Sequence, residues 1–234
     1  MLTLCNLDFG AFQWVQSGIS MVFLRNVLAA SLTVAVLTAC GSSEKTYFQT
    51  EGLRSPEGAC DVKPSRIGQA SKISDIHESN GCEVRNAWAV ESIGPVSFSQ
   101  PATLNCGMAE PLRMWLENTV QPAAGRELGE RVVGVDIAAS YSCRPRNNVR
   151  GAKMSEHGFG NAIDISGFTL ESGRKVSVLA DWNGDRDAKK FLRQVRGEAC
   201  GEFATVLGPG SDDHHRDHIH LDLQNRRSGN AYCH

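Results

Sequence analysis

The sequence predicts a single α+β domain in which helices flank a small antiparallel sheet that carries the candidate functional site. Two observations support this prediction: short apolar or alternating segments recur between turn residues, and two longer segments repeat apolar residues at helical spacing. The chain has 234 residues and contains no internal repeat or low-complexity tract, so one core of ordinary size accounts for it.

The strands are expected where short apolar runs lie between glycine, proline or other turn residues. The first two cover residues 84–90 and 96–98, with Gly94 and Pro95 between them. A later hairpin turn leads into a strand over residues 175–179. The remaining strands are expected at residues 132–138, 162–165, 203–207 and 219–223.

Two amphipathic helices are predicted from the apolar spacing. The first covers residues 108–120, with Pro111 in its first turn and Pro122 near its end. The second begins after Asp185, which is its expected N-cap. Trp115 in the first helix and Phe191 in the second are assigned to the core. The apolar positions of the second helix are Ala188, Phe191, Leu192 and Val195.

The N-terminal segment predicts export. Residues 27–39 form an apolar run that is shorter than the roughly 20 residues needed to span a bilayer, and Arg25 precedes it, as in a secretory signal. The ending Leu-Thr-Ala-Cys resembles a bacterial lipobox, which implies that Cys40 becomes a lipidated N-terminus. The alternative is an ordinary signal peptide with an unmodified Cys40.

The same segment predicts the domain organisation. Met21 is a better start than Met1, because it gives the signal a short basic beginning. We therefore expect a signal segment over residues 1–39, a lipidated tether over 40–58 and one domain over 59–234.

The cysteines agree with export. The chain has 8 cysteines, and setting aside Cys5 and Cys40 leaves an even six, which predicts three disulfides of open connectivity. A zinc–cysteine site is disfavoured, because no pair has the C-x-x-C spacing. The six are Cys60, Cys82, Cys106, Cys143, Cys200 and Cys233.

A histidine and an aspartate are placed as metal ligands often are. His157 precedes Gly158 and Gly160, which allow the chain to turn sharply and return as the strand 162–165. The isoleucines on either side of Asp164 point to one face of this strand, so Asp164 points to the other. Asp164 can therefore face a cleft while its neighbours face the core.

Two later histidines repeat this arrangement. His218 and His220 alternate with Ile219 and Leu221, so both lie on the polar face of a half-buried strand. A catalytic zinc ion is held by three histidine or carboxylate ligands and keeps one position open. Each half alone is more typical of ordinary hydrogen-bonded residues, whereas the two together favour a zinc site.

These residues also carry a family resemblance. The pattern Ser-x-His-x-x-Gly-x-Ala-x-Asp over residues 155–164, followed by His-x-His, resembles that of the LAS metallopeptidases, which cut peptidoglycan peptides. More narrowly, the stretch from about Cys60 to Cys233 resembles the bacterial extensin-like C-terminal domain family. The chain has only 8 prolines and no proline repeat, so nothing indicates a fibrous wall protein. The segments that carry the closer resemblance are residues 140–144, 155–164, 206–210 and 217–223.

The resemblance implies a LAS/Hedgehog-like metallopeptidase fold and one Zn²⁺ ion. By position, the zinc ligands are His157, Asp164 and His220. His218 becomes the nearby polarising or proton-handling histidine. Asp217 stands where the carboxypeptidase branch has a glutamate base, so either Asp217 or His218 takes the proton from water.

Other polar residues have roles that the sequence leaves open. The resemblance makes Arg144 the arginine that holds substrate, and its planar fork suits a carboxylate or an oxyanion, although it is equally typical of a basic surface loop. Asp222 and Asp136 are candidates to accept the second N–H of a ligand histidine, or are ordinary polar residues. His214 and His215 are expected to be exposed or on the substrate side of a flexible loop.

These features together predict a periplasmic, membrane-anchored lipoprotein that hydrolyses peptidoglycan. Zinc lowers the pKa of water, and a neighbouring base takes the proton. We expect a D,D-endopeptidase that cuts cross-linked stem peptides, with a D,D-carboxypeptidase or a non-catalytic wall-binding lipoprotein as alternatives. The expected partners are peptidoglycan stem peptides and the membrane, through Cys40. The net charge of −2 gives no reason to expect nucleic acid, and we expect a monomer.

Overall fold

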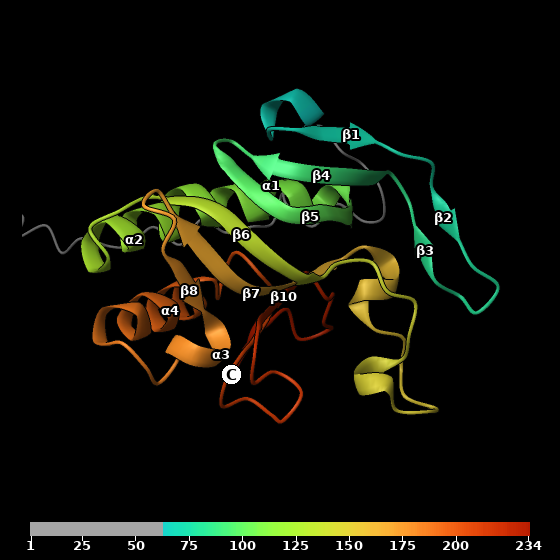
Figure 1. Ribbon diagram of the computed structural model, residues 1–234. Helices are drawn as coiled ribbons and strands as arrows, with labels where there is room; N and C mark the ends of the chain where they lie inside the picture. Colours follow the sequence, from blue (N-terminus) through green and yellow to red (C-terminus); the bar gives the residue numbers. More distant parts are fainter. Residues whose placement is uncertain (1–62) are drawn as a thin grey trace, which may run out of the picture. The chain divides into compact units, whose positions relative to one another are not determined.

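The computed structural model describes residues 63–234, which belong to one unit of mixed α/β structure (Figure 1). The predicted signal segment, the tether, Cys40 and Cys60 lie outside the described residues. No helix among residues 63–234 has the length and apolar character needed to cross a membrane.

The main sheet has nine strands, in the order β1-β4-β5-β6-β7-β10-β9-β11, with β8 beside β7. It is therefore larger than the small antiparallel sheet expected from the sequence. Two pairs are also parallel, β5 with β6 and β9 with β11. Its strands are β1 Ala70–Lys72, β4 Ala87–Ile93, β5 Val96–Asn105, β6 Val132–Ala139, β7 Ala162–Leu170, β8 Lys175–Ser177, β9 Thr205–Leu207, β10 Ile219–Asp222 and β11 Tyr232–Cys233.

The parallel pairing of β5 and β6 follows from their connection. A parallel pair needs a long crossover, usually a helix, and here helical segments fill the chain between the two strands. A separate small sheet joins β2 (Ile76–His77) to β3 (Glu83–Val84). The strand predicted over residues 84–90 is thus divided, because Asn86 has a left-handed φ of 50° and turns the chain between β3 and β4.

The first predicted helix is longer than expected. It begins with α1 (Cys106–Trp115), continues through a π-helical turn, η2 (Leu116–Val120), and ends with α2 (Gln121–Glu127). The Asn105 side chain caps it by accepting from the Met108 backbone N–H at 3.1 Å, so the helix starts earlier than predicted. Pro111 consequently lies inside α1, not in its first turn.

Pro122 does not end this helix, contrary to the prediction. It lies at the start of α2, directly after η2. A proline ring normally clashes with the carbonyl four residues earlier, and the wider π turn changes the spacing at that point. The helix therefore continues beyond the proline.

The second predicted helix is confirmed. It is α4 (Arg186–Glu198), and the Asp185 side chain accepts from the backbone N–H groups of Asp187 and Ala188. The strand expected over residues 175–179 is shorter than predicted, because Ser177 caps the short helix α3 (Val178–Asp181). The short 3₁₀ segments are η1 Pro64–Arg66, η3 Arg146–Asn148 and η4 Glu156–Phe159.

The core lies between the sheet and the helices. Trp115 is fully buried, and its indole N–H donates to the Val195 carbonyl on α4 at 2.9 Å. Its ring also packs near Phe168 of β7, which meets Phe191 edge to face. The assignment of Trp115 and Phe191 to the core is thus confirmed, and this packing holds β7 in place behind the site.

The expectation of disulfides is confirmed for two pairs, Cys82–Cys143 and Cys200–Cys233. Cys106 is disulfide-bonded as well. The first pair joins the turn before β3 to the segment after β6, and the second joins the end of α4 to β11.

Candidate metal centre

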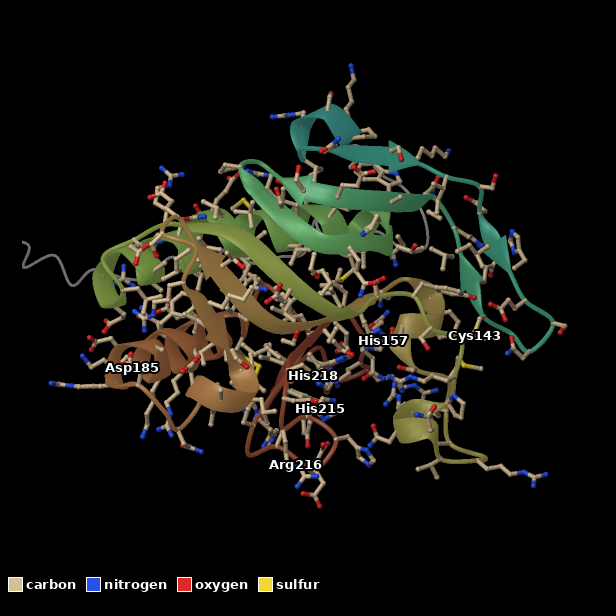
Figure 2. The ribbon with its side chains drawn as sticks, in the orientation of Figure 1. Cys143, His157, Asp185, His215, Arg216 and His218 are labelled. Atoms are coloured by element: carbon tan, nitrogen blue, oxygen red, sulfur yellow. A yellow bond between two sulfur atoms is a disulfide. The ribbon has the colours of Figure 1, made fainter. Side chains whose placement is uncertain are left out.

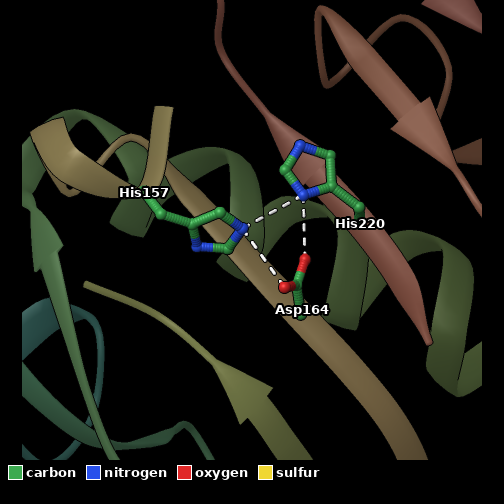
Figure 3. A group of neighbouring side chains, drawn as sticks. All are labelled: His157, Asp164 and His220. Atoms are coloured by element: carbon green, nitrogen blue, oxygen red, sulfur yellow. Dashed lines mark hydrogen bonds and ion pairs between the residues drawn. The ribbon is translucent and has the colours of Figure 1, made fainter. Parts of the chain in front are cut away.

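Three buried side chains converge where β7 pairs with β10: His157, Asp164 and His220 (Figure 3). His157 Nε2 lies 3.3 Å from His220 Nδ1 and 3.2 Å from Asp164 Oδ2. His220 Nδ1 lies 2.8 Å from Asp164 Oδ1. The residues implied as ligands by the family resemblance are therefore brought together from three elements.

Local backbone structure places each of these residues. Asp164 and His220 face one another because β7 and β10 pair in antiparallel register at this position. His157 lies on η4, which ends at Gly160 with a left-handed φ of 59°. A Cβ atom at Gly160 would lie 2.7 Å from the Asn105 backbone nitrogen, so only glycine allows this turn back into β7.

Outer contacts orient both imidazole rings. His157 Nδ1 lies 2.5 Å from the Ser140 carbonyl oxygen, which can only accept, so Nδ1 carries the proton. His220 Nε2 lies 3.0 Å from Asp222 Oδ2. Each ring therefore presents its other nitrogen to the cluster, as ligand histidines do.

The two candidate outer carboxylates differ in their contacts. Asp222 does contact His220, but Asp136 lies 3.7 Å from the exposed Lys175 Nζ and does not contact a candidate ligand. The Ser140 carbonyl takes the expected place beside His157. Asp136 pairs with Gly167, further along the sheet than Asp164, which explains the difference.

The donor set fits a zinc ion. Tetrahedral zinc with bonds of about 2.0–2.1 Å separates its ligand atoms by roughly 3.3 Å. The observed separations of 3.3, 3.2 and 2.8 Å fall near this value. Two imidazole nitrogens and a carboxylate oxygen that face one another in a buried place could hold a metal ion.

Hydrogen bonds and an ion pair join the three side chains in this structure. Burial alone would raise the pKa of Asp164, but hydrogen bonds with His157 and His220 hold it well below its ordinary value. Burial alone would lower the pKa of His220, but its bonds to Asp164 and Asp222 raise it to about 9. A metal ion that binds here must therefore displace a proton from His220.

His218 and Asp217 stand beside the cluster. His218 Nε2 lies 3.6 Å from Asp164 Oδ1, and His218 Nδ1 lies 2.8 Å from Asp217 Oδ1. The Asp217 side chain is 63% exposed, whereas that of His218 is 15% exposed. Asp217 thus holds the outer nitrogen of His218, and the inner nitrogen points to the candidate centre.

Comparison with known proteins identifies the family. Residues 58–234 match the family model described as extensin-like protein C-terminus. The chain belongs to this family. No curated protein and no solved structure matches the chain.

Two further residues of the extensin-like domain lie against the candidate centre and were not predicted. Thr205 on β9 donates its hydroxyl to Asp222 Oδ1, and Arg226 Nη2 donates to Thr205 Oγ1 at 2.7 Å. A hydrogen-bonded chain therefore runs from Arg226 to His220. The sequence gives no signal for it, because the contacts depend on the pairing of β9 with β10.

His215 lines the cleft beside the candidate centre, so of its two expected placements the structure favours the substrate side. It is buried, with 8% exposure, whereas its neighbour His214 is exposed as expected. His215 Nδ1 lies 2.6 Å from Asp212 Oδ1, and its ring centroid lies 5.2 Å from that of His218. Figure 2 shows His157, His215 and His218 gathered together, whereas Arg216 lies at the outer edge. The Asp-x-x-His spacing of residues 212–215 is the only sequence signal for this placement.

The centre opens into a cleft of about 550 Å³. Arg144 lines this cleft, as do Glu156 and the candidate ligands. Burial raises the pKa of Glu156, although a hydrogen bond from Asn161 acts against this. Among residues 63–234, no side chain forms a hydrogen bond or ion pair with that of Arg144, so its guanidinium can bind a ligand.

Proposed function

We propose that the extensin-like domain is a zinc-dependent peptidase with a LAS-type fold, which cuts the peptide cross-links of peptidoglycan. The observation that carries this proposal is the convergence of His157, Asp164 and His220 at separations suited to zinc, at the base of a cleft. A buried His-Asp-His set that also opens to a cleft is typical of a catalytic metal site.

His218 is the group best placed to handle a proton. Zinc, when bound, supplies Lewis acidity that lowers the pKa of water and polarises an amide carbonyl. The inner nitrogen of His218 faces the same space, and Asp217 fixes the ring through its outer nitrogen. We therefore assign His218 as general base and Asp217 as the residue that positions it.

Arg144 and His215 have supporting roles in this proposal. The Arg144 guanidinium on the cleft wall binds either the substrate oxyanion or a carboxylate. Burial lowers the pKa of His215, although its bond to Asp212 acts against this, so the ring is neutral near pH 7 and available as a hydrogen-bond donor or acceptor beside His218.

The proposed substrate rests on the motif and on the expected compartment. The motif resembles that of peptidases that cut peptidoglycan, and the two disulfides suit an exported protein. A lipid anchor at Cys40 would place the domain in the periplasm beside the wall. A D,D-carboxypeptidase is the second candidate, because Arg144 could instead hold a free terminal carboxylate.

The test is digestion of purified sacculi with zinc-loaded protein, followed by mass analysis of the released fragments. We expect cross-linked dimers to be converted to monomers, and no products from a His157→Ala variant. Conversion of pentapeptide monomers but not of dimers would show a carboxypeptidase instead. Binding of sacculi without any product would show a non-catalytic wall-binding protein and would contradict the proposal.

A further inference from the structure

The segment between Arg144 and the metal-binding region forms an arm that projects beyond the sheet (Figure 1). We call residues 144–154 the basic arm. Its base is closed by a backbone hydrogen bond from Ser155 N to the Arg144 carbonyl at 3.0 Å and by a bridge between Pro145 and Met154. His157 lies two residues after Ser155, so the base of the arm is fixed beside the candidate centre.

The basic arm carries only positive charge. It contains four cationic residues and no acidic one, in a chain whose net charge is −2. Arg146 is the only one of them with a counter-ion, Glu156 at 3.5 Å. Among residues 63–234, the side chains of Arg144, Arg150 and Lys153 form no ion pair or hydrogen bond. Three cations are therefore available to a ligand.

The arm presents these cations along a path that leads away from the centre. Arg144, Arg146, Asn147 and Asn148 line the cleft, whereas Arg150 and Lys153 are exposed outside it. Asn147 and Asn148 both have left-handed φ values, 53° and 56°, which fix the turn of the arm. Val149 at this turn is 55% exposed.

The loop over residues 211–217 has the other sign of charge. It includes Asp212, Asp213 and Asp217 against the single cation Arg216, and of these four residues Asp212 lines the cleft. The Asp213 side chain is 92% exposed. An anionic chain near the cleft is thus attracted to the arm and repelled from this loop.

We propose that the basic arm is a docking surface for a carboxylate-bearing polymer. The arm holds this polymer outside the candidate centre. This inference rests on the proposed function, because the stem peptides of peptidoglycan carry such carboxylates. Guanidinium groups bind carboxylates and phosphates alike. The test below therefore compares sacculi with and without free carboxylates.

The test measures sedimentation of zinc-loaded protein with purified sacculi, for the wild type and an Arg150→Gln/Lys153→Gln variant. Neither residue lines the cleft, so the small-substrate chemistry should be unchanged. The matched control is Arg186→Gln/Lys189→Gln on α4, which removes the same charge from an element that does not line the cleft. We expect the arm variant to bind sacculi roughly fivefold more weakly and the control to bind as the wild type does.

Two additional measurements identify the ligand. Binding of the wild type should weaken between about 50 and about 500 mM sodium chloride, because the exposed charges become screened. Sacculi whose carboxylates have been converted to amides should bind the wild type as weakly as the arm variant binds native sacculi. Unchanged binding to amidated sacculi would overturn the carboxylate assignment.

The outcome for the inference is separate from that for the proposed function. Equal binding by the arm variant and the wild type overturns the inference, even if sacculi are cleaved. Weakened binding by the arm variant, with unchanged binding by the α4 control variant, supports the inference. This holds even if cleavage products are absent and the peptidase proposal fails.

Discussion

Asp164 is the residue on which the candidate centre depends. It contacts both candidate histidine ligands, and its position on β7 opposite His220 is fixed by strand pairing. Its carboxylate supplies the only negative charge within the three-residue cluster, which a dication needs in a buried place.

Replacing Asp164 by Ala should abolish both zinc binding and hydrolysis. Two neutral imidazoles remain, and the charge that balances the metal is lost. Zinc content can be measured by elemental analysis after gel filtration, with Asp213→Ala as a control, because that aspartate is exposed on the neighbouring loop. Full zinc content in Asp164→Ala would show that Asp164 is not a ligand.

Replacing Asp217 by Ala should spare zinc and lower kcat by roughly 10- to 100-fold, as loss of a residue that orients a functional histidine does. The exposed Asp217 touches His218 and none of the three ligands. His218→Ala should cost more activity than Asp217→Ala, because it removes the proposed base itself. Greater activity in His218→Ala than in Asp217→Ala would make Asp217 the base.

At this scale, the sequence predicts the residues whose direction follows from strand alternation. Asp164, His218 and His220 could be grouped in this way, whereas His157 lies on η4 and is placed by the family resemblance; the structure brings all four together. His215 could not be placed, because a loop residue has no periodic face. Alternation could not decide between the two roles left open for Asp136, because it predicts the face of a strand but not the distance along it.

At the scale of elements, η4 is held between two segments that a disulfide joins. A Cβ atom at Gly158 would lie 2.7 Å from Cys82 Sγ, so the sulfur packs directly on the residue after His157. The other half, Cys143, is three residues from Ser140, whose carbonyl orients the His157 ring. The Tyr141 hydroxyl also donates to Glu78 across the same junction.

Removal of this disulfide should therefore weaken zinc binding. We expect the Cys82→Ala/Cys143→Ala variant to raise the zinc Kd about tenfold, because the orientation of His157 is loosened. The Cys200→Ala/Cys233→Ala variant is the control, and its zinc Kd should change less than about threefold. Chelator competition measures the zinc Kd of both variants. Equal effects of the two variants would show that the Cys82–Cys143 disulfide has no special role.

The elements themselves were predicted unevenly. The α4 helix follows from its cap and spacing, whereas the length of the first helix does not, because the π turn before Pro122 overrides the usual effect of proline. The size of the sheet and its parallel pairs depend on contacts between distant segments, such as β9 with β11. Local patterns do not encode those contacts.

At the scale of the whole molecule, folding, protonation and metal binding are coupled through His220. Its pKa in the metal-free fold is about 9, against an ordinary value of 6.5. The raised pKa of His220 adds to the free energy of unfolding. This contribution is fully present below pH 6.5 and is lost as the pH rises through about 9. Zinc has to displace the same proton.

Zinc affinity should consequently increase with pH. If one proton is displaced, the apparent Kd should fall about tenfold per pH unit over this range and level off above about pH 9. The stability of the metal-free protein should fall over the same range, while that of the zinc-loaded protein should not. Thermal unfolding with and without zinc measures this, and a pH-independent Kd would contradict the coupling.

The most direct test of the account is anomalous diffraction at the zinc absorption edge from a crystal of the zinc-loaded protein. We predict one peak about 2.0–2.2 Å from His157 Nε2, an Asp164 carboxylate oxygen and His220 Nδ1, on the side open to the cleft. A crystal with zinc bound elsewhere, or with no peak among these three side chains, would contradict the central claim.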